Sequence, residues 1–213
     1  KILQFLTRED ISNIKFYHFI EQIELDGNDC LISRTGYTGE LGYEIYADPK
    51  SILSIWERLL EVGNNYGLVP AGLGCRDTLR MEMNYLLYGN DIDLNTGPIE
   101  AGLGWITKFD KGDFIGKESI IQSKNKISKR IFCFSMLDRA IPRNGCQILH
   151  DNMLIGNVTS GTMSPMIKNG IGIGYIKKSH YKLDSRISIN IRGNLKKAKI
   201  IKPPFYRHGS LHN

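Results

Sequence analysis

A short segment of the chain, residues 34–45 (RTGYTGELGYEI), brings acidic, aromatic and glycine residues together. Its three glycines are spaced three residues apart. Glycine tolerates positive φ angles and close backbone approach, so the pattern predicts a tight turn between two strands that presents Tyr37, Glu40 and Glu44 together. Most glycine-rich turns merely join strands, however, so this segment alone does not identify a function.

A second dense segment, residues 71–82 (AGLGCRDTLRME), combines glycine with charged side chains. Apolar spacing predicts a helix over residues 75–84, with Arg76 in its first turn. The helix dipole disfavours a cation at that end, so we expect Arg76 to be positioned for a partner. The alternative is a structural ion pair with Asp77 or Glu82.

Two further groups of side chains could hold a metal ion, but their spacing argues against it. Asp91, Asp93 and Glu100 do not follow the spacing of an EF-hand loop, and we expect them to be solvated loop carboxylates or caps. The cysteines show no CxxC spacing and no nearby histidine, which predicts buried free thiols in a reducing compartment. They are Cys30, Cys75, Cys133 and Cys146. The sequence therefore predicts no metal site.

The composition of the 213-residue chain, with 41% hydrophobic and 23% charged residues, is ordinary for a folded protein. No apolar run approaches the length of a membrane-spanning helix. The net charge of +6 permits an anionic partner, whether nucleic acid, an acidic protein or a polyanionic small molecule. Charge alone does not choose among these partners.

The first part of the chain predicts a small antiparallel sheet with packed helices. A hairpin is expected from residues 21–25 and 29–33, and a third strand from residues 42–47. These strands follow one another too closely for crossover helices, so they should pair antiparallel. Asp48 followed by a proline suits a capped helix start, and apolar spacing then extends this helix to about residue 63.

The character of the sequence changes after a polar, basic stretch at residues 122–129, where we place the main domain boundary. Six short strand-like runs separated by turn signals follow, without a helical pattern. They span residues 131–137, 146–150, 153–159, 171–176, 186–191 and 195–201. Such a series predicts a small β-sandwich or barrel.

Motifs throughout this chain occur in an order that resembles aminomethyltransferase, the T protein of the glycine cleavage system. The two dense segments described above belong to the match. So do Leu87-Tyr-Gly-Asn-Asp-Ile-Asp93, Pro98-Ile-Glu-Ala-Gly-Leu103, Phe114-Ile-Gly116, Gly156-Asn-Val-Thr-Ser-Gly161, Ser164-Pro165 and Gly172-Ile-Gly-Tyr-Ile176. Because these motifs run through nearly the whole chain, together they are far more specific than any one of them.

The resemblance implies an α+β fold, with an antiparallel sheet and packed helices around a central folate-binding cavity, followed by a small all-β barrel. Residues 1–94 would be part of the folate-binding α+β domain, 95–124 a remnant of the second α+β domain, and 125–213 the barrel. Family members are longer at the N-terminus, so the chain resembles the C-terminal portion of one. The family's catalytic aspartate belongs to the missing segment, and we expect no activity from the chain alone.

The implied reaction takes the aminomethyl group on the lipoyl arm of H protein, adds its one-carbon unit to tetrahydrofolate and releases ammonia. The product would be 5,10-methylenetetrahydrofolate. Tetrahydrofolate is thus the expected co-substrate and H protein the expected partner, without a metal, nucleic acid or membrane. The expected location is the cytoplasm, or the mitochondrial matrix in a eukaryote.

The resemblance nominates five folate-binding side chains: Glu44, Arg76, Tyr37, Tyr88 and Arg207. Glu44 matches the family carboxylate that accepts hydrogen bonds from the pterin N–H groups. Arg76 matches the family arginine that contacts folate, and a guanidinium pairs well with the carboxylates of the folate tail. Tyr37 matches a tyrosine that lines the pterin pocket. Tyr88 and Arg207 are lesser candidates.

Glu40 is the rival of Glu44 for the pterin contact. The two residues are four apart, which on a strand would place both side chains on one face. The family motif puts the contact at Glu44, so Glu40 is expected to support the turn.

Two other interpretations remain. A folate-dependent demethylase, or a non-catalytic folate-binding protein of iron–sulfur assembly, would share the fold, although the cysteine-bearing glycine motif of the latter is absent from this sequence. A basic nucleic-acid-binding module would explain the cations near the C-terminus, which include Lys196, Lys197, Lys199 and Lys202. The sequence shows no RNP-type aromatic pattern or recognition-helix motif, and these lysines suit a solvated barrel face.

Overall fold

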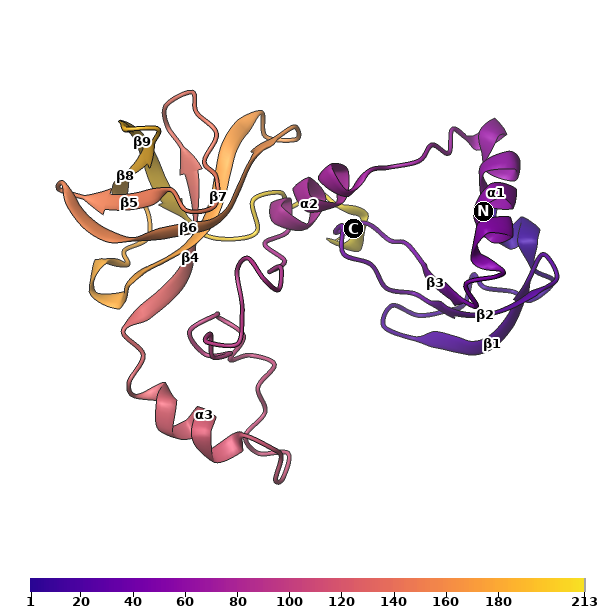
Figure 1. The fold of residues 1–213 in the computed structure, drawn as a ribbon. Helices are drawn as coiled ribbons and strands as arrows, with labels where there is room; N and C mark the ends of the chain where they lie inside the picture. Colours follow the sequence, from indigo (N-terminus) through magenta and orange to yellow (C-terminus); the bar gives the residue numbers. More distant parts are fainter. Residues whose placement is uncertain (213) are drawn as a thin grey trace. The chain divides into compact units, whose positions relative to one another are not determined.

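The computed structural model describes residues 1–212 of the chain (Figure 1). Its contacts divide the chain into two compact units. The sheet unit consists of residues 1–77 together with the C-terminal tail from His208, and the barrel unit consists of residues 78–207. The two units are described separately below. The boundaries predicted at residues 94 and 124 refer to the domains of a complete family member. They are not tested by this division and stay predictions.

The sheet unit is built on three antiparallel strands in the order β1 (Phe19–Leu25), β2 (Asn28–Ser33) and β3 (Glu44–Ala47) (Figure 1). The two-residue turn between β1 and β2 has positive φ angles at both Asp26 and Gly27. Such a turn matches the right-handed twist of paired strands. The hairpin and the antiparallel pairing predicted from the sequence are confirmed.

The helix α1 (Ile52–Gly63) packs against one face of this sheet (Figure 1). Its Ile55 is buried in the same cluster as Leu25 and Ile32 of the strands. The predicted helix is therefore present, but the predicted cap at Asp48 is wrong. The Asp48 carboxylate accepts a hydrogen bond from the Lys50 N–H at 2.8 Å and closes a turn that precedes the helix.

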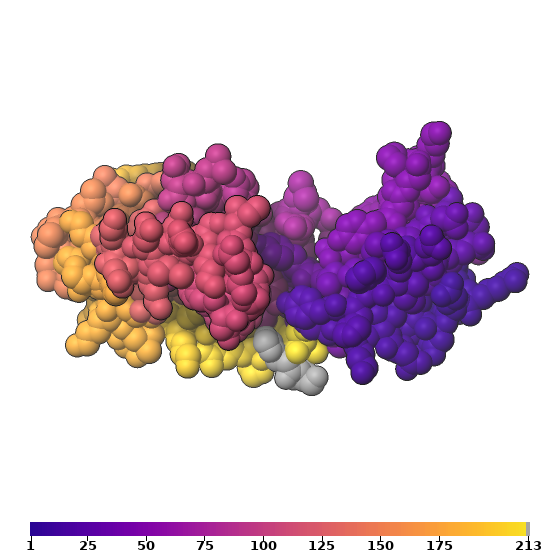
Figure 2. Space-filling model, turned by 90° about the horizontal axis from the view of Figure 1, so that it is seen from below, coloured from indigo at the N-terminus to yellow at the C-terminus, as the bar shows by residue number. Residues whose placement is uncertain are grey.

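Two further helices belong to the segments between the sheet and the barrel strands. The helix α2 (Leu73–Glu82) begins two residues before the predicted start and continues across the division between the units. The helix α3 (Lys117–Lys124) belongs to the barrel unit and buries none of its residues. The segment around α3 is visible at the surface in Figure 2. No helix in residues 1–212 has the length and apolar character needed to cross a bilayer.

The barrel unit contains a closed six-stranded barrel with the strand order β4-β7-β6-β5-β8-β9. The strands are β4 (Lys129–Met136), β5 (Gln147–His150), β6 (Met153–Ser164), β7 (Asn169–Lys177), β8 (Arg186–Ile191) and β9 (Asn194–Ile201). Alternating side chains such as Phe134, Ile148 and Ile189 fill its interior and are fully buried. Closure leaves no strand edge open. The predicted fold class, an α+β part followed by an all-β barrel, is confirmed.

Glycine permits the close approach of β6 and β7. A Cβ atom at Gly156 would lie 1.8 Å from the backbone oxygen of Tyr175. A Cβ atom at Gly172 would lie 2.2 Å from the ring of Phe134 in the barrel core. The glycine motifs of this region therefore have a packing reason that does not depend on any ligand.

We expect Gly156→Ala to lower the free energy of unfolding by about 2 kcal/mol, because the methyl group would force the two strands apart. Gly97→Ala is the matched control, since a Cβ atom at Gly97 would have no neighbour within 4 Å. Urea denaturation followed by far-ultraviolet circular dichroism would measure both variants. Equal midpoints for the two variants would contradict this explanation of the barrel glycines.

Candidate functional site

The glycine turn, residues 34–43, joins β2 to β3 in the sheet unit. At its base Ser33 pairs with Glu44 in the strand register. The hydroxyl of Thr35 donates a hydrogen bond to the Glu44 carboxylate and lies 2.8 Å from the hydroxyl of Ser33. Glu44 is exposed at the first position of β3. One strand end and one hydroxyl thus fix an acidic side chain that faces solvent.

Arg34 closes the same turn from its other side. Its guanidinium carbon lies 4.2 Å from the centroid of the Tyr43 ring, a distance typical of a cation–π contact. Its Nη1 also donates to the carbonyl oxygen of Gly42 at 3.4 Å. The first and last residues of the turn are therefore held together by side-chain contacts.

Tyr37 and Arg76, two of the predicted site residues, lie together in the sheet unit. The guanidinium carbon of Arg76 is 4.9 Å from the centroid of the Tyr37 ring. Arg76 is exposed in the first turn of α2. Arg76 thus lies against an aromatic face, and its role toward a ligand stays a prediction. Glu82, the more distant alternative, is buried and accepts a hydrogen bond from the Ser164 hydroxyl.

Glu40 lies at the tip of the turn and Glu44 at its base. Since β3 begins at Glu44, Glu40 lies within the turn as predicted, and the two carboxylates do not share a strand. Glu40 accepts hydrogen bonds from the backbone N–H and the hydroxyl of Ser210. These hydrogen bonds hold the pKa of Glu40 below its usual range. The contacts agree with the supporting role predicted for Glu40.

Tyr88 and Arg207 belong to the barrel unit. Tyr88 follows α2 in a turn, where it bridges to Ile92, and its side chain is 64% exposed. Arg207 is exposed and donates to the backbone oxygen of Lys202 at 3.5 Å. Neither contact tests whether these side chains bind folate, so the predicted folate roles of both residues stay predictions.

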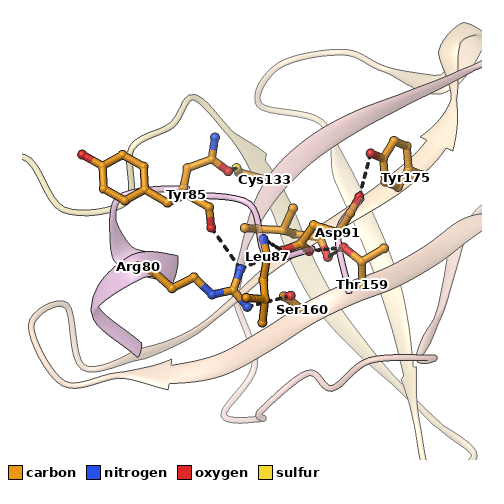
Figure 3. Close-up of polar contacts among 10 residues, drawn as sticks. Arg80, Tyr85, Leu87, Asp91, Cys133, Thr159, Ser160 and Tyr175 are labelled. Atoms are coloured by element: carbon orange, nitrogen blue, oxygen red, sulfur yellow. Dashed lines mark hydrogen bonds and ion pairs between the residues drawn. The ribbon is translucent and has the colours of Figure 1, made fainter. Parts of the chain in front are cut away.

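A buried polar network in the barrel unit was missed from the sequence (Figure 3). Its centre is an ion pair between Arg80 of α2 and Asp91, with 2.7 Å between Nη1 and Oδ2 and both side chains inaccessible to solvent. Arg80 also donates to the Ser160 hydroxyl and to the backbone oxygen of Tyr85, each at 3.0 Å. The network therefore joins α2 and the turn after it to strand β6.

Asp91 is satisfied from several directions, so its prediction as a solvated loop carboxylate or cap is wrong. Besides Arg80, it accepts hydrogen bonds from the Leu87 N–H at 2.9 Å and from the Thr159 hydroxyl. The phenol of Tyr175 donates to its backbone oxygen at 2.9 Å. Burial, followed by the charges of nearby carboxylates, raises the pKa of Tyr175, which keeps the phenol protonated as a donor.

The other two loop acids behave as predicted. The Asp93 carboxylate accepts hydrogen bonds from the N–H of Asn95 and the hydroxyl of Thr96. Glu100 accepts one from the Gly97 N–H at 3.0 Å. Within residues 1–212, no group of three or more histidine, cysteine or acidic side chains is arranged to hold a metal ion.

All four cysteines are free thiols, as predicted, but not all are buried. Cys30 and Cys133 are buried, Cys146 is half-buried, and Cys75 is exposed. The prediction is wrong for Cys75 because the first turn of α2 has its residues exposed. Burial raises the pKa of the Cys133 thiol, which donates to the Asn84 side chain at 2.9 Å.

Comparison with known families matches both parts of the chain. Residues 1–111 match the family described as GCVT N-terminal domain, and residues 129–207 match the glycine cleavage T-protein C-terminal barrel domain. The chain belongs to the glycine cleavage T-protein family. The resemblance found in the sequence motifs is thereby confirmed.

Relatives within this family are named aminomethyltransferases. The chain is 45% identical over 208 residues to the one from Caldanaerobacter subterraneus, which covers 97% of the chain and 56% of the relative. It is 47% identical over 206 residues to the one from Halothermothrix orenii, covering 96% of the chain and 57% of the relative. The chain thus spans little more than half the length of these T proteins.

A solved T-protein structure has the same fold. It is the glycine cleavage system aminomethyltransferase T from Bartonella henselae, with a TM-score of 0.87 and 27% sequence identity. The match covers 98% of the chain and 57% of that structure.

We expect Asp91→Asn to destabilise this T-protein chain by about 3–5 kcal/mol, because the neutral amide leaves Arg80 charged and buried without a counter-ion. Asp93→Asn is the matched control, since Asp93 caps an exposed turn in the same loop. Urea denaturation of the two variants would measure the difference. A similar loss of stability in both would contradict the assigned importance of the buried pair.

Proposed function

We propose that the protein containing this chain is the aminomethyltransferase of the glycine cleavage system. It transfers the one-carbon unit of the aminomethyl group, carried on the lipoyl arm of H protein, to tetrahydrofolate and releases ammonia, yielding 5,10-methylenetetrahydrofolate. Family membership supports the reaction class. The observation that carries the proposal is the meeting of Tyr37 and Arg76 beside a turn whose base carries Glu44.

Glu44 binds the pterin in this proposal. An ionised carboxylate offers about four lone-pair sites, and the hydroxyl of Thr35 takes only one of them. The remaining sites can accept hydrogen bonds from neighbouring N–H donors of a flat heterocycle. Thr35 therefore orients the carboxylate without exhausting its capacity as an acceptor.

Tyr37 and Arg76 contribute different contacts. The Tyr37 ring offers a flat apolar face for the pterin pocket, while the fork of Arg76 suits the carboxylates of the folate tail. Their contact at 4.9 Å limits where the guanidinium can go before folate binds. Tyr88 and Arg207 are kept as secondary folate contacts. No general base is assigned within residues 1–213, and we propose that catalysis needs an aspartate of the complete family protein.

We expect Glu44→Gln to weaken tetrahydrofolate binding about 10- to 100-fold, because the amide replaces an acceptor oxygen by a donor that opposes the pterin N–H groups. Calorimetry on the product of the complete reading frame would measure the dissociation constant. Glu57→Gln, an exposed substitution on α1, is the matched control. Unchanged affinity in Glu44→Gln would refute the pterin assignment.

The role of Arg76 predicts a dependence on the folate tail. Arg76→Ala should weaken polyglutamylated tetrahydrofolate by about tenfold, while a pterin without the glutamate tail should lose little affinity. Arg58→Ala in α1 is the control, because Arg58 is engaged with Glu61 and Asp26 instead. An equal loss of affinity for the two ligands would show that Arg76 does not bind the glutamate tail.

A further inference from the structure

The C-terminal strap, residues 209–211, lies across the tip of the glycine turn in the sheet unit. It follows the region matched by the family's barrel domain, which ends at residue 207. Four hydrogen bonds connect the strap to residues 39–41, about 170 positions earlier in the sequence. The contact is therefore a long-range one that local sequence patterns do not reveal.

Ser210 makes three of these hydrogen bonds. Its backbone N–H donates to the Glu40 carboxylate at 2.9 Å, and its hydroxyl donates to the same carboxylate oxygen. The hydroxyl oxygen in turn accepts a hydrogen bond from the Leu41 N–H at 2.8 Å. One small side chain thus serves both a charged group and a backbone group of the turn.

The strap also satisfies backbone groups that the turn cannot pair through a strand ladder. The N–H of Leu211 donates to the carbonyl oxygen of Gly39 at 3.3 Å, and Gly39 is buried. Residues 34–43 lie outside β2 and β3, so their backbone needs partners from elsewhere. The strap supplies partners for the carbonyl oxygen of Gly39 and the N–H of Leu41, which restrains the tip of this irregular loop.

Gly209 allows the strap to come this close. It is buried, and a Cβ atom added to it would lie 2.5 Å from the carbonyl oxygen of Gly39. A backbone atom cannot swing away as a flexible side chain can, so any larger residue would push the strap off the turn. The position therefore requires glycine for steric reasons.

We propose that the strap is a positioning element for folate: by fixing residues 39–41 through Ser210, it holds Tyr37 ready for the pterin. The inference rests on the proposed function. The turn contains three glycines and connects two strands, so without the strap its tip would sample many conformations. Folate binding would then have to order the loop, which lowers affinity without altering the reacting groups.

The test compares strap variants of the product of the complete reading frame with matched controls. Ser210→Ala removes the hydroxyl contacts, Gly209→Ala adds the clash, and Ser210→Thr keeps the hydroxyl as a conservative rescue. Ser54→Ala removes an exposed hydroxyl from α1 in the same unit and serves as the control. Amide hydrogen exchange over residues 36–42 and calorimetry with tetrahydrofolate are the two measurements.

We expect Ser210→Ala and Gly209→Ala to raise amide exchange in the turn and to weaken tetrahydrofolate binding about tenfold. Ser210→Thr and Ser54→Ala should behave like the unmodified protein. In the assay of one-carbon transfer, KM for tetrahydrofolate should rise while kcat stays the same, because the strap touches no reacting atom.

Unchanged exchange in residues 36–42 would overturn the proposal, because the strap would then not order the turn. Faster exchange with unchanged folate affinity would also overturn it, because the order of the turn would then not matter to the ligand. In either case a loss of affinity in Glu44→Gln would leave the proposed function standing. If the unmodified protein does not bind tetrahydrofolate at all, the proposed function fails, and the folate role of the strap fails with it.

Discussion

The buried ion pair between Arg80 and Asp91 is the contact on which the arrangement of α2 depends. Neither side chain reaches solvent, and further hydrogen bonds reach the pair from Ser160, Leu87 and Thr159. Removing a partner from such a pair leaves a buried charge, which is far more destabilising than the loss of a surface ion pair. The pair holds the second half of α2 against strand β6.

The glycine turn combines local freedom with restraint at both ends. Its base is fixed by Arg34 against Tyr43 and by Thr35 against Glu44. Its tip is fixed by the strap. Glycine lets the backbone follow this course, but the ordered state comes from the side-chain and backbone contacts around it. The turn can thus present an exposed carboxylate and an aromatic ring in fixed places although it contains no regular strand.

The sequence predicted the features that depend on local pattern. Strand alternation, the Asp26-Gly27 turn and the glycine motifs indicated the sheet, the hairpin and the barrel, because each depends on neighbouring residues. Asp91 was misjudged because its partner lies eleven residues away on a helix, and neither residue's own neighbours signal burial. The contact between Glu40 and Ser210 joins positions 170 apart, beyond any periodicity. Tyr37 and Arg76 were each nominated from family resemblance, but their contact with one another was not predicted.

The central claim is that the glycine turn and the start of α2 together form part of a folate site. The most direct measurement is amide chemical-shift mapping of the product of the complete reading frame during titration with tetrahydrofolate. The account predicts that the largest shifts fall in residues 34–44 and 73–77, with strands β8 and β9 unaffected. Shifts confined to the barrel strands, or no shifts in either of those two segments at saturating ligand, would contradict it.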